Sequence, residues 1–326
     1  MEVAALASLS AGGPLVPFRL ERRSVGRTDV LLEVLYCGLC ISDLDPLRDP
    51  AGRFPRVPGH EVVGRVVETG RSVRRVKVGE LAAVGWVTDA CGTCEACRDG
   101  FVPGCDLAAV PRIGGYSTHV VVDERFVFRV PDGLVPAQVP PLLCSGSVLY
   151  ALLRGRSTMP GDRVAVVGNG GVAELASKLA QALGAEATRV SMEELAGLSR
   201  GAGDGRLAGR FDVVVNAEVE PPEKITEERQ FMLALLRHGG SFLICEEPLP
   251  PPVLGISLEL DGDEMRLAAT ACRLEQTQEV IDLCAARGVT LDVEVVSFRD
   301  IEEAHARLER EPGRRLVADM STLPGR

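Results

Sequence analysis

Four cysteines stand close together in one short segment and could bind a metal ion. The segment reads CGTCEACRDGFVPGC, and its sulfur atoms belong to Cys91, Cys94, Cys97 and Cys105. Four thiolates brought together by tight turns form a closed tetrahedral site that suits a structural Zn²⁺ and leaves no position for a substrate. Four free thiols in a surface loop, or an iron–sulfur cluster, fit this spacing less well. We therefore expect the segment to bind zinc and to stabilise part of the fold.

A second group of potential metal ligands is spread along the chain. Cys40 lies in LYCGLCISDLDPL, His60 and Glu61 lie in PGHEVVG, and Cys144 lies in PPLLCSGSVLY. A catalytic zinc takes three protein ligands and keeps one position open for water or a substrate oxygen. Each residue also has an ordinary explanation, because buried cysteines usually pack as small hydrophobic residues and lone histidines are usually hydrogen-bonded in loops. Residue types and spacing alone leave both interpretations open.

The stretch VVGNGGVAELA is a third candidate for chemistry. Gly168, Gly170 and Ala173 form a GxGxxA pattern, with Gly171 inside it, between an apolar run at 163–167 and a helical pattern. Glycines permit the tight turn and the close approach of a dinucleotide pyrophosphate, whose charge is favoured at a helix N-terminus. The motif alone is weak, and a purely structural turn is the alternative. Its position between a strand and a helix favours nucleotide binding.

The elements around these residues are of two kinds, which indicates two domains. Residues 1–148 contain short β-branched stretches separated by Gly and Pro, without a long helical period, and predict an irregular β domain. From 149 to 286, strand patterns alternate with helical patterns, which predicts a parallel sheet covered by helices. The tail reads as strand, helix and strand, and could extend this sheet or return to the first domain.

Composition restricts the partners and the location. The chain has 326 residues, a formal net charge of −10, and 46% hydrophobic and 25% charged residues, as in an ordinary globular protein of two domains. A nucleic acid or an anionic membrane would need a basic patch, so neither is expected as a partner. No apolar run approaches a membrane span, and no basic leader precedes an apolar core at the N-terminus. We therefore expect a cytoplasmic protein, in which clustered cysteines bind metal more often than they form disulfides.

In this order, these segments resemble the zinc-dependent medium-chain dehydrogenase/reductase superfamily, most closely its cinnamyl-alcohol-dehydrogenase-like branch. The resemblance covers nearly the whole chain and is carried by YCGLCISDL, VPGHEVVGRVVETG, CGTCEACRDG, GGYSTHVVVDERFVFRV, PPLLCSGSVLY, the glycine turn and EQTQEVIDLCAARGV. It implies an α/β fold, with a GroES-like β domain over 1–148 that is completed by about 287–326. Residues 149–286 would form a Rossmann domain with a doubly wound parallel sheet. The implied reaction is hydride transfer between NAD or NADP and an alcohol or aldehyde.

The resemblance also assigns roles to single residues. Its two zinc sites comprise Cys40, His60 and Cys144 for a catalytic ion, and Cys91, Cys94, Cys97 and Cys105 for a structural ion. Glu61 becomes a neighbour that can bind the catalytic metal in turn, and Asp43 matches the acid that orients the histidine ligand. Ser42 matches the hydroxyl that passes the alcohol proton away from the metal. Arg315 falls where the family carries an arginine near the cofactor.

The chain departs from the family pattern at two positions near the catalytic site. Family members usually have a histidine after the zinc cysteine and another after the following leucine, where this chain has Ile41 and Asp45. Isoleucine cannot hydrogen-bond a phosphate, so that contact is lost. Asp45 could accept a proton at the end of the relay, but its ordinary pKa of about 4 suits neutral pH poorly unless burial raises it.

The nucleotide-binding half departs from the pattern as well. After the second expected strand, in TRVSMEELAGL, Ser191 keeps a family hydroxyl while Glu193 replaces another. A carboxylate repels a phosphate dianion and can hydrogen-bond a ribose diol, so Glu193 favours NAD over NADP. The nearby Arg189 could attract the 2′-phosphate of NADP and partly reverse this preference. The following segment, up to RFDVVVNAE, is shorter than the family pattern, as if a helix and a strand had been removed.

Three functions follow from these observations. The first is a zinc-dependent NAD(P)-linked alcohol dehydrogenase or aldehyde reductase, acting on a small-molecule alcohol, aldehyde or biosynthetic intermediate; this is the interpretation we adopt. The second is a lyase, cyclase or isomerase that keeps zinc as a Lewis acid but binds the cofactor weakly or not at all. The third is a non-catalytic scaffold, which the intact catalytic ligands argue against. We expect a homodimer, because GSFLICEEPLPPPVLGISLEL lies where the superfamily often pairs its Rossmann sheets.

Overall fold

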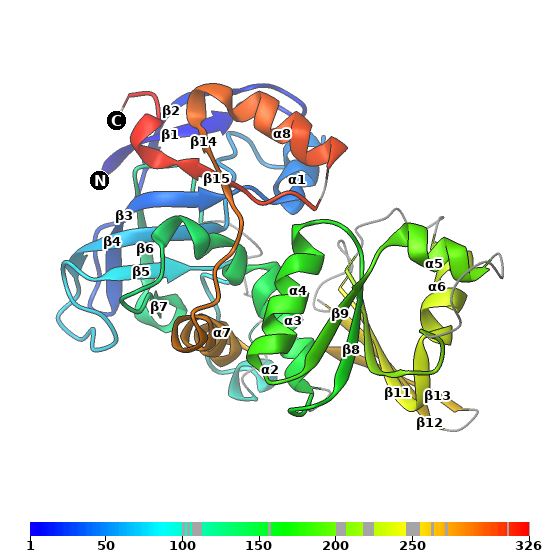
Figure 1. Cartoon of the computed structure of the whole chain (residues 1–326). Helices are drawn as coiled ribbons and strands as arrows, with labels where there is room; N and C mark the ends of the chain where they lie inside the picture. Colours follow the sequence, from blue (N-terminus) through cyan, green and yellow to red (C-terminus); the bar gives the residue numbers. More distant parts are fainter. Residues whose placement is uncertain are drawn as a thin grey trace. The chain divides into compact units, whose positions relative to one another are not determined.

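The structure is a computed structural model, and it separates the chain into two compact units. The residues described are 1–99, 102, 105, 113–155, 158–199, 207–217, 225–245, 255–261, 264–270, 273–311 and 313–325. One unit consists of Met1–Cys144 and Arg273–Arg326, and the other of Ser145–Cys272. Figure 1 shows the elements of each unit along the chain.

The first unit is built on an antiparallel sheet centred on β3. The strand order is β14-β15-β3-β4-β5-β7, with β6 also paired to β3. The strand bounds are β3 Asp29–Gly38, β4 Glu61–Thr69, β5 Leu81–Val84, β6 His119–Asp123, β7 Phe128–Arg129, β14 Glu294–Ser297 and β15 Leu316–Asp319. Only β14 and β15 run parallel among the paired strands described in this sheet. A separate hairpin is formed by β1 Glu2–Ser8 and β2 Leu15–Glu21.

Short helices fill the connections of the first unit. They are η1 Ile41–Asp43, α1 Leu44–Arg48, α2 Glu95–Arg98, η3 Glu124–Phe126, η4 Pro136–Gln138, η5 Pro140–Leu143, α7 Leu274–Arg287, η7 Phe298–Asp300, α8 Ile301–Arg310 and η8 Met320–Thr322. The core between them consists of aliphatic and aromatic side chains, among which Val30, Leu32 and Val34 of β3 are fully buried. Burial of this apolar surface is the main force that holds the sheet and the helices together.

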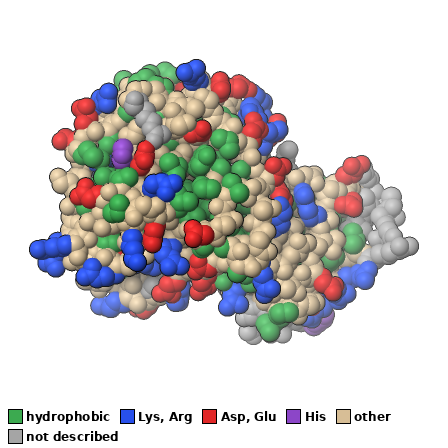
Figure 2. Space-filling view, turned by 60° about the vertical axis from the view of Figure 1, so that its left-hand side comes forward, with side chains coloured by type: hydrophobic (Ala, Val, Ile, Leu, Met, Phe, Trp, Pro, Cys, Tyr) green, Lys and Arg blue, Asp and Glu red, His purple; other side chains and the backbone are tan. Residues whose placement is uncertain are grey.

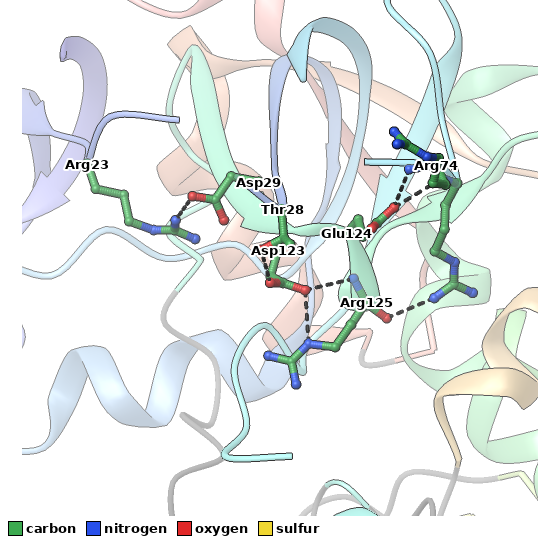
Figure 3. A network of polar contacts seen from close by, with 8 residues as sticks. Arg23, Thr28, Asp29, Arg74, Asp123, Glu124 and Arg125 are labelled. Atoms are coloured by element: carbon green, nitrogen blue, oxygen red, sulfur yellow. Dashed lines mark hydrogen bonds and ion pairs between the residues drawn. The ribbon is translucent and has the colours of Figure 1, made fainter. Parts of the chain in front are cut away.

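A polar network ties the start of β3 to the turn after β6 (Figure 3). The Thr28 hydroxyl donates to Asp123 Oδ2 at 2.7 Å, and the Arg125 backbone and Nε donate to Asp123 Oδ1 at 3.0 and 2.9 Å. Glu124 Oε2 accepts from the Arg74 backbone N–H at 2.7 Å. Each bond is exposed and therefore individually weak, but together they fix two loops to the sheet.

Helix α7 belongs to the first unit, so the divide lies at Cys144 and Arg273 and not at the positions 148 and 287 expected from the sequence. The physical reason is its packing against β7 and η5. Gln278 Oε1 accepts from the Arg129 backbone N–H at 2.8 Å, and Gln278 Nε2 donates to the Arg129 carbonyl at 3.1 Å. Val280 and Ile281 are fully buried on the same helix.

The second unit is an α/β sheet in which four consecutive strands, β11, β10, β8 and β9, run parallel. The strand order is β13-β12-β11-β10-β8-β9. The bounds are β8 Arg163–Val167, β9 Glu186–Val190, β10 Phe211–Asn216, β11 Leu236–Ile244, β12 Gly255–Asp261 and β13 Glu264–Thr270. The expected parallel sheet is thus present, and it is extended at one side by β12, which pairs antiparallel with both β11 and β13. The register of β12 and β13 pairs Asp261 with Glu264, and so tight a connection cannot link parallel strands.

Helices cover both faces of this sheet (Figure 1). Helices α3 Ser145–Gly155 and α4 Gly171–Ala182 pack together on one face, and α5 Met192–Ser199 and α6 Ile225–Ala234 pack together on the other. Only α5 lies between β9 and β10 in the part of the chain that is described, and β9 is the outermost strand there. A Rossmann sheet in the usual order carries a further strand beyond this one.

The surface mixes charges of both signs, and the described helices do not favour a membrane span. Figure 2 shows Lys and Arg side chains interspersed with Asp and Glu over the face in view. Among the described residues, no single helix is long and apolar enough to cross a membrane. The two consecutive segments Pro136–Leu143 and Ser145–Gly155 meet that criterion only when they are taken together across a bend.

Gly288 ends α7 in the left-handed conformation, with φ of 62° and ψ of 34°, and nothing lies within 4 Å of a Cβ built there. We predict that Gly288→Ala lowers the free energy of unfolding by about 1 kcal/mol, because alanine is strained in this conformation. Urea denaturation measures the change. Gly155→Ala is the matched control, since Gly155 also has open space and lacks a positive φ. An equal loss in both variants would contradict the conformational explanation.

Candidate functional site

The register between β3 and β4 brings two of the expected metal ligands together. Gly38, at the end of β3, lies opposite Glu61, at the start of β4. Cys40 follows the first strand and His60 precedes the second, so both lie at the same end of the sheet. Helix η5 packs against β3, β4 and β5 and ends next to Cys144. The ligand atoms of Cys40, His60, Glu61 and Cys144 all lie within 4.8 Å of one another.

Asp43 sets the direction of the His60 ring. Asp43 Oδ1 accepts from His60 Nδ1 at 3.0 Å and from the Gly59 backbone N–H at 3.0 Å. Because an ionised carboxylate can only accept, Nδ1 carries the proton and Nε2 is left for a metal. Burial would raise the pKa of Asp43, but His60 and the Gly59 N–H outweigh it and lower that pKa. The carboxylate therefore stays ionised beside His60.

Cys40 is placed in an environment that favours its thiolate. A hydrogen bond with Cys144 lowers the Cys40 pKa well below its ordinary value, with His60 acting in the same direction against burial. The Ser42 hydroxyl donates to Cys40 Sγ at 3.2 Å. Thiolate is the form of cysteine that binds metal ions. The arrangement thus prepares one sulfur ligand and puts the expected relay hydroxyl in direct contact with it.

Glu61 is held in the same buried space. A Cβ built at Gly38 would lie 2.0 Å from Glu61 Oε2, so only glycine at position 38 leaves room for this carboxylate. Burial raises the pKa of Glu61 well above its ordinary value, and Cys40 adds to the rise, while His60 and Arg315 oppose it. Arg315, the residue before β15, is thus near enough for its charge to act on Glu61.

This donor set fits a zinc ion. Two cysteine sulfurs and one histidine nitrogen are the ligands that catalytic zinc takes in one well-known class of site, with a further position for water or substrate. Cys40, His60 and Cys144 supply these atoms, and Glu61 adds an oxygen within reach. A cation here would also offset the burial of the Asp43 and Glu61 carboxylates, which are 5% and 4% exposed.

Four further cysteines form a second cluster in the first unit. The sulfur atoms of Cys91, Cys94, Cys97 and Cys105 lie within 4.8 Å of one another. Cys91 Sγ accepts from the backbone N–H groups of Thr93 at 3.4 Å and Cys94 at 3.2 Å, and these bonds lower the Cys91 pKa to about 5. Desolvation raises the Cys97 pKa to about 12. Four thiols at this spacing suit a closed tetrahedral metal site.

The two unusual positions near Cys40 have different surroundings. Ile41 is partly buried and packs against the hydrophobic core of the first unit. Asp45 is exposed on α1 and so lacks the burial that its expected role in a proton relay required. Asp45 therefore does not provide the buried acid that was considered from the sequence.

The glycine turn joins β8 to α4. Gly168 has a φ of 138°, and its backbone N–H donates to the Val190 carbonyl of β9 at 3.1 Å. Gly170 caps α4, and Ala173 is fully buried in the first turn of that helix. In the sheet, β8 lies between β9 and β10, so the strand order reverses at β8. Sheets of this kind bind their ligands at the carboxyl end of the strands where the order reverses. The free N–H groups at the start of α4 suit a pyrophosphate.

Ser191, Glu193 and Arg189, at the end of β9 and just after it, have different surroundings. Ser191 is used as a helix cap, because its hydroxyl donates to Glu194 Oε2 at 2.8 Å and accepts from the Glu194 backbone N–H at 3.2 Å. Glu193 is exposed. Arg189 Nη2 donates to the Asn169 carbonyl at 3.0 Å, which puts a guanidinium directly on the glycine turn.

Two buried residues near Asp43 were not expected from the sequence. The hydroxyl of Tyr116 lies 3.0 Å from Nε2 of His305, which belongs to α8. The one available signal was that His305 occupies the apolar face of the helical pattern IEEAHARL, with Ile301 and Leu308. Nothing in the local sequence distinguished Tyr116.

Comparison with known proteins gives one consistent result. Residues 26–132 match the family model of the alcohol dehydrogenase GroES-like domain. Cinnamyl alcohol dehydrogenase 8 of Arabidopsis thaliana is 32% identical over 98% of this chain and 96% of its own length. Aldehyde reductase YahK of Escherichia coli (strain K12) is 34% identical over 99% of each. The solved structure of cinnamyl alcohol dehydrogenase SbCAD4 from Sorghum bicolor has a TM-score of 0.79 at 28% identity, covering 98% of both chains.

Asp43 provides a direct test of how the site is oriented. We predict that Asp43→Asn speeds zinc release from the Cys40–His60–Cys144 site about 10- to 100-fold, because His60 loses its charged partner. Transfer of zinc to a chromophoric chelator measures the rate. Asp45→Asn serves as the control, since it neutralises an exposed acid in the neighbouring turn. Equal release rates in the two variants would argue against an orienting role for Asp43.

Proposed function

The chain belongs to the zinc-dependent medium-chain dehydrogenase/reductase superfamily, in its cinnamyl-alcohol-dehydrogenase-like branch, and we propose that its buried site in the first unit interconverts alcohols and aldehydes. The observation that carries the proposal is the convergence of Cys40, His60 and Cys144 around one point, with Asp43 on the far side of the imidazole. This arrangement leaves three metal-binding atoms facing a common position and fixes the orientation of one of them.

Each residue of the site then has a defined task. Cys40, His60 and Cys144 hold the zinc ion, and Glu61 is an alternative ligand next to it. A zinc ion bound there acts as a Lewis acid on the substrate oxygen. Asp43 holds the His60 tautomer that leaves Nε2 free. Cys91, Cys94, Cys97 and Cys105 hold a second, structural zinc ion, so that each chain binds two.

Ser42 is the residue that we propose to move the proton of the alcohol. Its hydroxyl already contacts Cys40 Sγ at 3.2 Å, which places it at the edge of the metal site. A hydroxyl can accept a proton from the substrate while it donates its own to the next acceptor. Because Asp45 is exposed on the following helix, that next acceptor is solvent or an ionised surface carboxylate.

The cofactor that we propose for this chain is NADP(H). The helix start at Gly170 and Gly171 binds the pyrophosphate, and Arg189 lies on the glycine turn, where a guanidinium can pair with the 2′-phosphate. This proposal reverses the preference for NAD that Glu193 suggested from sequence, because Glu193 is exposed whereas Arg189 contacts the turn itself. Relatives named as NADP-dependent alcohol dehydrogenases, from Mycolicibacterium smegmatis, are consistent with it.

A zinc lyase, cyclase or isomerase is the second candidate function. The observation that favours it is the position of β9 as the outermost described strand of its sheet, where the usual Rossmann order continues. Less of the adenosine would then be covered, and cofactor binding would weaken. A homodimer formed through the second unit and a cytoplasmic location, both expected from the sequence, remain predictions.

Cysteine substitutions separate the two proposed metal sites. We predict that Cys40→Ala abolishes NAD(P)H-linked aldehyde reduction and halves the zinc content with little change in melting temperature. Cys94→Ser should also halve the zinc content but lower the melting temperature by about 5 °C or more, because a structural zinc stabilises the fold directly. Zinc analysis, thermal denaturation and a steady-state assay measure these effects. Equal losses of melting temperature would contradict the division into catalytic and structural sites.

Cofactor titration tests the nucleotide proposal. We predict that Arg189→Ala weakens NADPH binding about 10- to 100-fold, the cost of one hydrogen bond to a charged group, and changes NADH binding less than about twofold. Fluorescence titration of each cofactor gives the dissociation constants. Glu193→Gln is the control and should strengthen NADPH binding slightly. If the wild-type chain with both zinc sites filled bound neither cofactor, the dehydrogenase function would be excluded in favour of the second candidate.

A further inference from the structure

Tyr116 and His305 form a buried pair close to Asp43. The Tyr116 hydroxyl lies 3.0 Å from His305 Nε2, and the two rings stack with centroids 5.9 Å apart at an angle of 21°. Phe298 makes a T-shaped contact with the Tyr116 ring, with centroids 5.1 Å apart. Tyr116 is 0% exposed and His305 is 7% exposed. A hydrogen bond that is buried in this way holds both rings in one arrangement.

Tyr116 is coupled directly to the backbone that precedes the His60 ligand. Its backbone N–H donates to the Pro58 carbonyl at 3.0 Å, and the Gly115 N–H donates to the Gly59 carbonyl at 2.8 Å. The ring lies so close that a Cβ at Gly59 would be 2.7 Å from Tyr116 Cδ1. Gly59 in turn donates its N–H to Asp43 Oδ1. A displacement of the Tyr116 ring would therefore move a peptide that contacts Asp43 and leads into His60.

His305 is close enough to the same carboxylate for the charge of Asp43 to act on it. It lies on α8, which packs against the 3₁₀ helix η1 that carries Asp43, and an ion pair between Arg48 and Glu309 also links α8 to α1. Charged groups that act on His305 are Asp43, Glu302, Glu309 and Arg48. Burial lowers the pKa of His305, so the ring is neutral at neutral pH and offers one acceptor nitrogen to the Tyr116 hydroxyl.

Asp43 needs this support because its hydrogen bonds are one-sided. Both of its hydrogen bonds are made by Oδ1, whereas Oδ2 is buried and has no hydrogen-bond partner among the residues that the structure describes. Two bonds to a single oxygen leave the carboxylate able to rotate about that oxygen. The neighbouring packing, and not a hydrogen bond, must then limit the rotation.

We propose that Tyr116 and His305 are positioning residues, whose mutual hydrogen bond fixes the Gly59 peptide and the Asp43 carboxylate and so the direction in which His60 presents Nε2. The proposal rests on the proposed function, since it requires that His60 binds the catalytic zinc. Neither residue touches a metal ligand through its side-chain hydrogen bond; each acts through Gly59 and Asp43.

The test uses Tyr116→Phe, His305→Phe and His305→Gln in the full-length zinc-loaded protein. Tyr116→Phe removes only the hydroxyl, and His305→Phe keeps a ring but removes the acceptor, whereas the glutamine carbonyl can restore the acceptor. We expect Tyr116→Phe and His305→Phe to release catalytic zinc about 3- to 10-fold faster than wild type, a smaller effect than that of changing Asp43, which contacts His60 directly. His305→Gln should stay within about twofold of wild type. Cobalt substitution should show an altered visible spectrum for the same two variants only.

Two controls separate positioning from a general loss of stability. Release from the four-cysteine site, followed in the same experiment, should be unchanged in every variant. Tyr36→Phe removes a phenol hydroxyl from the same unit and should leave both release rates unchanged. Wild-type release and spectra in Tyr116→Phe and His305→Phe would overturn the proposal, as would equal acceleration at both metal sites. If the wild-type chain held no metal at Cys40 and His60, the proposed function would itself fail, which is a different and recognisable result.

Discussion

The pairing of β3 with β4 is the constraint on which the metal site depends. Because Gly38 lies opposite Glu61, the residues just beyond one strand and just before the other reach the same end of the sheet. A slip of one residue would turn each side chain to the opposite face and would separate Cys40 from His60. Gly38 has a second task at this point, since any larger side chain would occupy the space of the Glu61 carboxylate. The register and one glycine thus bring the metal-binding atoms together.

Local patterns in the sequence were sufficient for those parts of the protein that are built from neighbouring residues. The four-cysteine segment and the glycine turn each lie within one stretch of chain, so spacing alone indicated their geometry, and the alternation of strands and helices indicated the α/β unit. The convergence of Cys40, His60 and Cys144 depends on long-range pairing, and it entered only through a resemblance to a family. Helix α7 was assigned to the wrong unit because its amphipathic pattern does not say which sheet it covers.

The least predictable part of the site is the layer behind its ligands. Tyr116 and His305 are far apart in sequence, and they meet because α8 returns to the first sheet beside η1. A histidine on the apolar face of a helix is usually an ordinary core residue, so its type gave no reason to connect it with Asp43. Likewise, Glu193 and Arg189 both lie near the end of a predicted strand, and only the fold shows that the arginine bends onto the glycine turn.

The outer position of β9 has a consequence for association between chains. An edge strand presents unpaired backbone N–H and C=O groups, which can recruit a strand from another molecule and begin aggregation. Here the exposed residues of that strand are Glu186, Thr188 and Arg189, so two of its three exposed side chains are charged. Charges on an edge strand oppose intermolecular pairing because they would have to be desolvated or brought near like charges. Arg189 therefore opposes intermolecular pairing at the outermost described strand with the same guanidinium that contacts the turn.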